Sequence, residues 1–536
     1  MTLATTELFA SLDPEVLTDV LAGARHRAFR PGEELCREGE PAASVFVLKS
    51  GAAEVLVGGE RHRVRRLRRG DVVGEIALIT GEPRSATVRA SVATEAVEIG
   101  RDTITSVMAA HPQLLVNLSR ILSRRLARAH VEHIVAGRGE AVALVLGHSA
   151  ESALSAILSA AAAATPKPVT SLCLGPGMTS ASTAPSTEAA ADALDDLLAD
   201  HGFVLVVALP TTPGLATLVA QVDRTVVIGT PEECANIRQS LAESARAETV
   251  DLGRRGVPWL ARHVTRTKLG LALGAGGAKG YAHVGVLTVL EEAGYTIDAV
   301  SGSSIGAVVA ACIAMGMNSA DIDATLHRRF SPEVVADVFA LSFSGSSTGY
   351  ATMQALTQDL AAGRDAEDLD IPFVAVAADL NTRLPVEMST GPLADALLAS
   401  TALAGLFPPF VREGQRLVDG LALVPVPVDA VSASGADITL SVNLMSRDIL
   451  EAWPGEQAST LPSGKQRMLE TLLEVMDLTQ LDASVRTAAR ADVVVTPRFG
   501  PCTWRDFHFA ERFTAAGRDA ALGAIDQLRA LANPMH

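Results

Sequence analysis

The sequence is poor in cysteine, the residue that builds disulfide frameworks and cysteine-ligated zinc centres. It has five cysteines in 536 residues, and no two of them form a C-x-x-C pair. An odd number of scattered cysteines predicts reduced thiols and argues against a disulfide scaffold or a cysteine zinc site. We expect no metal ion and no catalytic cofactor. The five are Cys36, Cys173, Cys234, Cys312 and Cys502.

Long apolar runs are missing as well. No stretch of about 20 strongly apolar residues could span a bilayer, and the nearest candidate, residues 152–164, is short and rich in alanine and serine. The N-terminus lacks the basic segment and apolar stretch of a signal peptide. We expect a cytoplasmic protein, and the excess of arginine over lysine is typical of high-GC bacterial genomes.

Basic residues are fewer than acidic residues. The chain has 45 Lys and Arg against 61 Asp and Glu, a net charge of −16. Nucleic-acid binding requires the opposite sign, so no nucleic-acid partner is expected. The arginine-rich run 61–69 contains only two apolar residues, and we interpret it as a solvated hairpin.

A G-x-S-x-G string, Gly302 to Gly306, is the first feature that predicts chemistry. A β-prone run, residues 295–300, precedes it, and small apolar residues that suit a helix follow it. A serine on such a sharp strand-to-helix turn is presented as a nucleophile, and Gly302 and Gly306 let the backbone turn. Ser304 is therefore the candidate nucleophile. A second copy at 345–349 has no strand before it and is not assigned.

A glycine-rich loop precedes this string. Residues 269–273 predict a strand, residues 274–280 the loop, and the following residues a helix through Leu290. Backbone N–H groups at such a loop bind anions, and in acyl transfer they form an oxyanion hole. A dinucleotide site does not fit, because the third glycine of that motif would fall at Lys279. The candidate oxyanion residues are Gly274, Gly276, Gly277, Lys279 and Gly280.

Asp419 is the candidate base. It follows a hydrophobic pair and precedes a proline-rich turn, where a carboxylate could accept the serine proton. A triad remains an alternative, since Ser304, Asp419 and His508 follow the α/β-hydrolase order. The aromatic segment 504–513 favours a packed or surface role for His508, and His283 is expected to cap or pack its helix. We favour the dyad of Ser304 and Asp419.

The N-terminal third and the middle of the chain predict two further folds. Short alternating apolar runs separated by turn residues in 29–51 are typical of a small β-barrel. Apolar runs at 141–146, 171–174, 203–209 and 224–229 alternate with helical segments and predict a parallel α/β layer. This middle layer has no recognisable phosphate loop, so we assign it no chemistry.

The glycine loop, the G-x-S-x-G string and the late Asp-Gly pair, in that order, resemble the patatin-like phospholipase family over Lys268 to Ala430. The resemblance implies a Ser–Asp dyad that hydrolyses acyl esters of lipids, with Ser304 as nucleophile and Asp419 as base. Three residues depart from the family pattern: Ala275 interrupts the glycines, Lys279 replaces the commoner arginine, and Leu421 replaces a small residue. None of them removes a reacting group.

Residues 74–88 resemble the phosphate-binding cassette of cyclic nucleotide-binding domains. The resemblance implies that Arg84 and a helix N-terminus from Gly74 bind the cyclic phosphate, that Glu75 accepts a bond from the ribose hydroxyl, and that Ser85 adds a hydroxyl. Residues 102–130 would then form the hinge and lid helices. Cyclic AMP is favoured over cyclic GMP only weakly.

The order of these parts resembles the neuropathy target esterase group. We predict a multidomain chain: a cyclic nucleotide-binding β-barrel with flanking helices (1–135), a middle α/β domain (140–262) and an α/β patatin-like hydrolase domain (267–536). Its expected activity is lysophospholipase-type ester hydrolysis, with cyclic AMP or cyclic GMP as an allosteric ligand and with contact at the inner face of the membrane. The alternative is a cyclic nucleotide sensor with a vestigial esterase domain that acts through a partner. The sequence does not indicate an oligomeric state.

Overall fold

The computed structural model forms two compact units, residues 1–158 with 167–257 and residues 159–166 with 258–536. The predicted barrel (1–135) and middle α/β domain (140–262) thus lie mainly in the first unit, and the predicted hydrolase domain (267–536) lies in the second. The structure describes residues 9, 20, 23–41, 43–57, 62–68, 71–74, 83–91, 93–111, 114, 139–174, 182–183, 193–194, 196–198, 200–241, 247–338, 348–445, 465–500, 502 and 504–535.

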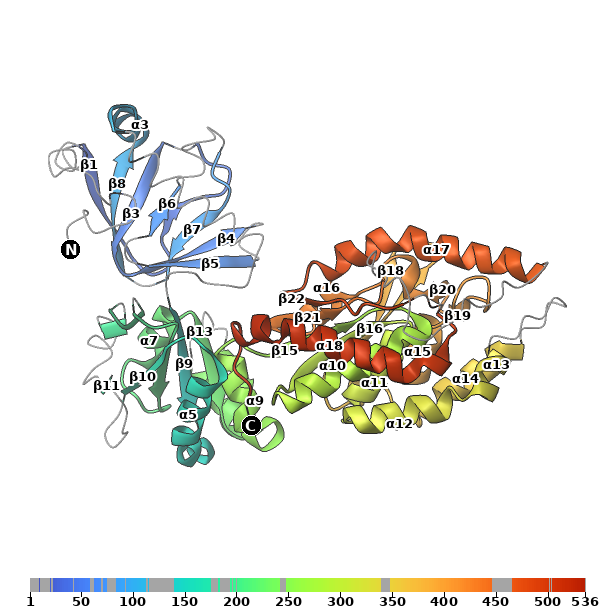
Figure 1. Ribbon diagram of the computed structural model, residues 1–536. Helices are drawn as coiled ribbons and strands as arrows, with labels where there is room; N and C mark the ends of the chain where they lie inside the picture. The colour runs from blue at the N-terminus through green and yellow to red at the C-terminus, as the bar shows by residue number, and fades with distance from the viewer. Residues whose placement is uncertain are drawn as a thin grey trace. The chain divides into compact units, whose positions relative to one another are not determined.

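The N-terminal part of the first unit is a barrel of two antiparallel sheets (Figure 1). Side chains of β3 alternate between two cores: Phe46 and Leu48 face the barrel interior, whereas Val45 and Val47 pack towards Ile104 of the following helix. This two-residue period is what the alternating runs predicted. The elements are β1 (Ala24–Phe29), β2 (Glu34–Cys36), β3 (Ser44–Ser50), β4 (Ala52–Val57), β5 (His62–Arg68), β6 (Val72–Val73), β7 (Thr87–Ala90), β8 (Thr94–Gly100) and α3 (Arg101–Ala110).

The rest of the first unit is a parallel sheet in the order β11-β10-β12-β9-β13-β14. Its central strands are buried along their whole length, which explains their unbroken apolar sequences. After β9, the chain forms β10, β11 and β12 on one side of that strand and then β13 and β14 on the other. The elements are β9 (Glu140–Leu146), η3 (His148–Ala153), α5 (Leu154–Ala164), β10 (Val169–Leu174), β11 (Ser182–Thr183), β12 (Phe203–Ala208), α7 (Leu215–Gln221), β13 (Arg224–Ile228), α8 (Pro231–Ser240) and β14 (Ala247–Val250).

The second unit is built on a mixed sheet in the order β19-β20-β17-β16-β15-β21-β22, and β18 pairs with β17. Strands β22, β21, β15, β16 and β17 are parallel, and β18, β19 and β20 run antiparallel to their neighbours. The strands are β15 (Leu269–Leu273), β16 (Ile297–Ser303), β17 (Phe373–Asp379), β18 (Pro385–Met388), β19 (Phe410–Arg412), β20 (Gln415–Asp419), β21 (Ile438–Val442) and β22 (Val493–Val495).

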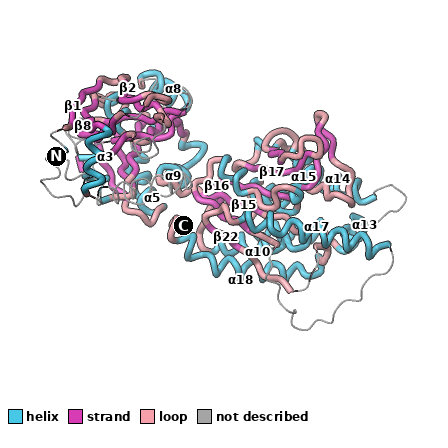
Figure 2. The backbone as a smooth tube through the Cα atoms, turned by 90° about the horizontal axis from the view of Figure 1, so that it is seen from above, coloured by secondary structure: helices cyan, strands magenta, loops and turns pink. Residues whose placement is uncertain are grey.

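Helices cover both faces of this sheet, as Figures 1 and 2 show. Leu271 of β15 faces the core formed with α10, α11 and α18, and the next residue, Ala272, faces α16 and the end of α17. The helices are α9 (Leu252–Val264), η4 (Gly277–Gly280), α10 (Tyr281–Glu292), α11 (Ile305–Ala314), α12 (Ser319–Arg329), α13 (Pro332–Val338), α14 (Thr348–Ala361), η5 (Ala366–Asp368), α15 (Leu393–Ser400), η6 (Gly420–Ala422), α16 (Val428–Ala433), α17 (Lys465–Ala488), η7 (Phe507–Phe509) and α18 (Ala510–Arg529). The predicted fold class, a multidomain chain with an N-terminal barrel and α/β sheets, is confirmed.

Candidate active site

Ser304 lies between the end of β16 and the start of α11, as the G-x-S-x-G string predicts. Its backbone has φ 57° and ψ −127°, a conformation that a residue with a side chain rarely adopts and that is typical of a nucleophile elbow. The flanking glycines are required by close contacts. A Cβ on Gly302 would lie 2.2 Å from the Gly306 carbonyl oxygen, and one on Gly306 would lie 2.2 Å from that of Leu273.

Asp419 lies against this serine. The Ser304 hydroxyl donates a hydrogen bond of 2.6 Å to Asp419 Oδ2, and the Leu421 amide donates one of 2.9 Å to Oδ1. The carboxyl group is only 3% exposed. Burial raises its pKa to about 6, although both hydrogen bonds favour the charged form. The carboxyl group is thus mostly ionised at neutral pH, and it can accept a proton close to that pH.

Segments distant in sequence hold the two residues together. The hydroxyls of Ser301 and Ser303 on β16 donate to the carbonyls of Pro427 and Val424, each at 2.7 Å. The Ala275 amide donates to the Pro425 carbonyl at 3.0 Å. The proline-rich turn after Asp419 is therefore bonded to both the nucleophile strand and the glycine loop.

Ser400 is a site residue that the sequence analysis missed. Its hydroxyl accepts a hydrogen bond from the Ser304 amide at 3.0 Å and donates one to the Val376 carbonyl at 2.7 Å. It fixes the strained backbone of the elbow to β17. No motif marks a lone serine at the end of α15, so only the packing of that helix reveals it.

The glycine loop divides into residues with free and occupied backbone N–H groups. Among the described residues, none accepts a bond from the amides of Gly276 and Gly277, and both glycines line the cavity beside Ser304. The Gly274 amide instead donates to Val442 of β21. Lys279 lines the cavity, but its amide donates to Gly276 and its ammonium lies 5.8 Å from the Phe499 ring. Gly280 allows the side chain of Ile305 to pack against the loop backbone, because a Cβ at this position would lie 2.3 Å from Ile305.

Neither alternative histidine reaches the serine. His283 is 1% exposed, and its Nε2 lies 2.8 Å from the Gly274 carbonyl oxygen, which requires a proton on that nitrogen. Burial lowers its pKa to about 4, so the ring is neutral and supports the glycine loop from behind. His508 is exposed and its ring lies 4.0 Å from that of Phe509. Neither lines the cavity.

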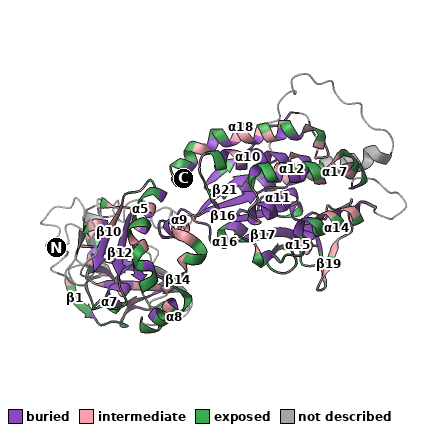
Figure 3. Cartoon of the chain, turned by 90° about the horizontal axis from the view of Figure 1, so that it is seen from below, coloured by how far each residue is buried: buried purple, intermediate pink, exposed green. Residues whose placement is uncertain are grey.

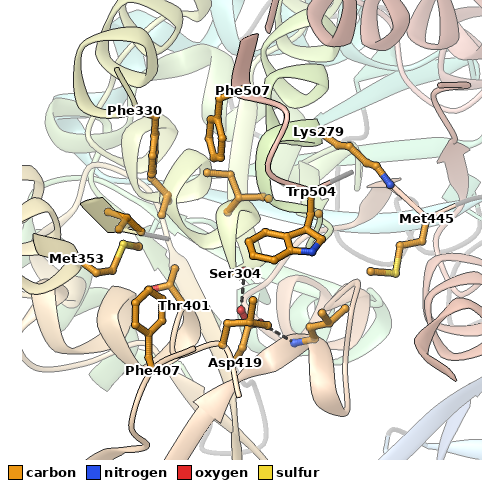
Figure 4. Close-up of a pocket in the computed structure, with 17 residues that line it drawn as sticks. Lys279, Ser304, Phe330, Met353, Thr401, Phe407, Asp419, Met445, Trp504 and Phe507 are labelled. Atoms are coloured by element: carbon orange, nitrogen blue, oxygen red, sulfur yellow. Dashed lines mark hydrogen bonds between the residues drawn. The ribbon is translucent and has the colours of Figure 1, made fainter. Parts of the chain in front are cut away.

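An apolar cavity of about 790 Å³, including its open part, extends from Ser304 and Asp419 (Figure 4). Leu421, one of the departures from the family pattern, forms part of its wall. The other apolar wall residues could not be predicted from the sequence, because they come from separate elements. These are Ile305, Val308, Phe330, Val338, Met353, Leu403, Phe407, Met445, Trp504 and Phe507.

The predicted nucleotide site is described in part. Arg84 is 6% exposed, and its guanidinium donates to the carbonyls of Ser44 at 2.6 Å and Gly74 at 3.2 Å. Gly74 has φ 86°, and a Cβ there would collide with the guanidinium. Ser85 is exposed, and Glu75 lies outside the described residues. Within the described part of the chain, no carboxylate pairs with Arg84, so its buried charge suits an added anion.

A second serine–carboxylate pair is present in the middle sheet. Ser149 follows β9, and its hydroxyl and amide both donate to Glu233 of α8; the amide bond is 3.1 Å. The Thr230 amide also donates to this carboxylate, at 2.8 Å, as part of a capping box. These bonds, that of the Ser149 hydroxyl first, lower the pKa of Glu233 to about 2. The carboxylate therefore closes a helix end.

Three other observations bear on function. The described residues contain no group of three or more His, Cys, Asp or Glu side chains suited to hold a metal ion. None of the described helices has the length and apolar character needed to cross a bilayer. Of the second G-x-S-x-G string, residues 345–347 lie outside the described residues, and α14 begins at the next residue.

Comparison with known proteins follows the same division. Residues 271–432 match the patatin-like phospholipase family, and residues 26–111 match the cyclic nucleotide-binding domain. An uncharacterized NTE family protein of Mycobacterium tuberculosis is 27% identical over 97% of this chain and 95% of its own. Lysophospholipase nte1 of Aspergillus fumigatus is 33% identical over 35% of this chain but 13% of its own. The solved Catabolite Activator Protein of Thermus thermophilus is 25% identical with a TM-score of 0.23, over 24% of this chain and 61% of that one.

The glycine loop, elbow and Asp-Gly pair fall within the first match, and Arg84 falls within the second. The substrate is a lipid ester. The chain therefore has a patatin-like phospholipase domain and an N-terminal cyclic nucleotide-binding domain, it is similar to NTE family proteins over nearly its whole length, and it is a lipid ester hydrolase.

Proposed function

We propose that Ser304 and Asp419 form a catalytic dyad that hydrolyses lysophospholipids, and that a cyclic nucleotide regulates the reaction. The observation that supports the dyad best is the 2.6 Å hydrogen bond between a strained serine and a buried carboxylate at the end of an apolar cavity. A base with a pKa of about 6 is well suited to accept a proton near neutral pH.

In this mechanism Ser304 Oγ attacks the ester carbonyl carbon while its proton moves to Asp419 Oδ2. The tetrahedral oxyanion accepts hydrogen bonds from the unoccupied amides of Gly276 and Gly277. The intermediate collapses to an acyl-enzyme, and the protonated Asp419 gives its proton to the departing alcohol oxygen. Water then attacks the acyl-enzyme with Asp419 again as base, which releases the fatty acid and regenerates Ser304.

The apolar wall of the cavity supports an acyl chain as the bound group, since aromatic and aliphatic side chains from several elements surround one reactive hydroxyl. Lysophospholipid is the preferred class because the fungal relative that matches this domain is named a lysophospholipase. Such a substrate places the enzyme at a membrane surface, and we propose the cytoplasmic face.

Cyclic AMP or cyclic GMP is the proposed allosteric ligand of the barrel. The buried guanidinium of Arg84 now donates to two carbonyls, and a cyclic phosphate would offer it charged acceptors instead. No catalytic cofactor is required by the mechanism above.

A hydrolysis assay on lysophosphatidylcholine, with and without each cyclic nucleotide, tests the proposal. We expect fatty-acid release, labelling of Ser304 by a fluorophosphonate, and a rate that changes when nucleotide is added. A folded protein that neither labels nor hydrolyses any ester would favour the alternative, a nucleotide sensor with a vestigial esterase domain.

Arg84→Ala tests the nucleotide site in the full-length protein. Loss of the charge-assisted bonds to phosphate should weaken binding by about 2–4 kcal/mol, roughly 30- to 1,000-fold, in titration calorimetry. Ser85→Ala, at an exposed neighbour, should change affinity far less. If millimolar cyclic AMP and cyclic GMP give no heat with the wild-type protein, the barrel is not a receptor for either.

A further inference from the structure

Three aliphatic side chains project into solvent from two neighbouring turns of the catalytic unit. Leu380 and Leu384, in the turn between β17 and β18, are 45% and 61% exposed, and Val411 on β19 is 68% exposed. Figure 3 shows the hairpin of β19 extending from the body of this unit, coloured largely as exposed or intermediate. Apolar side chains gathered on protruding turns indicate a contact surface. We call residues 380–384 and 411–416 the hairpin surface.

Hydrogen bonds fix the two turns to each other. The Leu380 amide donates to the Arg416 carbonyl at 2.9 Å, and Asn381 Nδ2 donates to the Gly414 carbonyl at 2.8 Å. The buried carboxylate of Asp379 accepts from the amides of Asn381 and Arg416, both at 3.1 Å. The exposed side chains are therefore held outward by an ordered support.

Strand register places the hairpin surface at the edge of the sheet that contains the active site. Ser303, next to the nucleophile, pairs with Val376 in the parallel strand β17, and Asp419 of β20 pairs with Ala377. The chain beyond Asp379 thus projects past the carboxyl ends of the parallel strands. Arg416 is three residues from Asp419, about 10 Å along the strand.

The charge of the hairpin surface differs from that of the whole chain. Arg383 and Arg416 are exposed, and within the described part of the chain no carboxylate pairs with either. Arg412 lies 3.9 Å from Glu413. On a chain of net charge −16, unpaired arginines beside exposed aliphatic side chains complement an anionic lipid headgroup and the acyl region beneath it.

We propose that the hairpin surface docks the enzyme on membranes that contain anionic phospholipid. Leu384 and Val411 enter the interface, Arg383 and Arg416 contact headgroup phosphates, and the neighbouring active site is presented to lipid. This inference rests on the proposed function for its purpose, but vesicle binding can be measured without catalysis.

The experiment is flotation of the full-length protein with phosphatidylcholine vesicles and with vesicles containing 30% phosphatidylglycerol. We expect the double variant Leu384→Asp/Val411→Asp to reduce partitioning onto the anionic vesicles by about tenfold or more. Arg383→Gln/Arg416→Gln should reduce it several-fold, and only on anionic vesicles at low salt. Leu522→Asp on α18, at a leucine that is 51% exposed, is the matched control and should bind as wild type.

Hydrolysis of a water-soluble short-chain ester separates this inference from the proposed function. All three variants should keep wild-type rates on that ester, since none changes the cavity wall or the dyad. Wild-type partitioning by the aspartate double variant, or a failure of the wild type to bind either vesicle, would overturn the docking surface. If the aspartate double variant also loses hydrolysis of the soluble ester, the test depends on the double variant Arg383→Gln/Arg416→Gln. Wild-type binding of this variant to anionic vesicles, at low and at high salt, would reject the proposal.

Discussion

In the described part of the chain, two serine–carboxylate pairs lie after parallel strands, and their environments shift the pKa of the carboxylate in opposite directions. Ser304 bonds to Asp419 after β16, and Ser149 bonds to Glu233 after β9. Asp419 accepts two hydrogen bonds in a buried place, and its pKa is raised to about 6. Glu233 accepts three, with its serine exposed, and its pKa is lowered to about 2.

The comparison indicates how two hydrogen-bonded pairs of serine and carboxylate can differ in their suitability for catalysis. A base must be able to take up a proton near the working pH, and donors that stabilise its charged form reduce that ability. Burial raises the pKa of Asp419, so its carboxylate can accept a proton near neutral pH. The hydrogen bonds that Glu233 accepts as a helix cap lower its pKa, so its carboxylate is a much weaker base. Within the described residues, the amides of Gly276 and Gly277 are unoccupied beside the first pair, and an apolar cavity adjoins it.

The two pairs should differ most in the effect of removing the serine hydroxyl. Ser304→Ala should reduce ester hydrolysis by at least about 10³-fold, because the covalent step is lost. Ser149→Ala, the matched change in the middle sheet, should leave the rate near that of the wild type. Steady-state rates and fluorophosphonate labelling measure both. Equal losses in two folded variants would show that the pairs are not functionally distinct.

The next difference is in the carboxylates. Asp419→Asn keeps the shape but removes the base, so hydrolysis should fall by about 10²- to 10³-fold. Glu233→Gln should change the rate by less than about twofold, since its carboxylate acts as a helix cap. His508→Ala should also retain activity; loss of Ser304 labelling in that variant would instead support a triad.

The pH dependence follows from the raised pKa of Asp419. The base must be ionised, and it becomes protonated as the pH falls through about 6. Below that value kcat/KM should fall by about tenfold per pH unit, and above it the rate should reach a plateau. Glu233→Gln should leave this profile unchanged. A profile that is flat from pH 5 to 8 would exclude Asp419 as the titrating base.

The smallest expected difference is in stability. Removal of the charge should stabilise the fold at Asp419 and destabilise it at Glu233. The pKa of Asp419 in the folded protein lies above its ordinary 3.8, so the folded unit loses stability as the pH rises from about 4 to about 6, and this loss is complete at pH 7. Asp419→Asn should therefore increase the free energy of unfolding at pH 7 by about 1–3 kcal/mol. The pKa of Glu233 is lowered, so Glu233→Gln should lower the melting temperature of its unit at pH 7. Calorimetry that resolves the two units measures both, and a melting temperature lowered by Asp419→Asn would contradict the argument.

Much of the fold and of the site could be predicted from short stretches of sequence. The strands that lead into the glycine loop at Gly274 and into the turn at Ser304 are local signals, and so are the glycines of both segments, because close backbone contacts exclude side chains at fixed positions. The alternating and unbroken apolar runs likewise predicted the barrel and the parallel sheets. The sequence could not decide which loop amides remain free: Gly274 is bonded to β21, whereas Gly276 and Gly277 are not.

Sequence alone determined the candidates for the proposed nucleophile, base and phosphate ligand, because Ser304, Asp419 and Arg84 each lie in a motif with a local backbone requirement. Tertiary structure alone decided their state. The hydrogen bond of the dyad joins residues 115 positions apart, Ser400 supports the elbow from another helix, and the cavity wall is assembled from many elements. Proton transfer, charge burial and acyl-chain contact depend on distances and on exclusion of water, and these arise only when segments remote in the chain pack together.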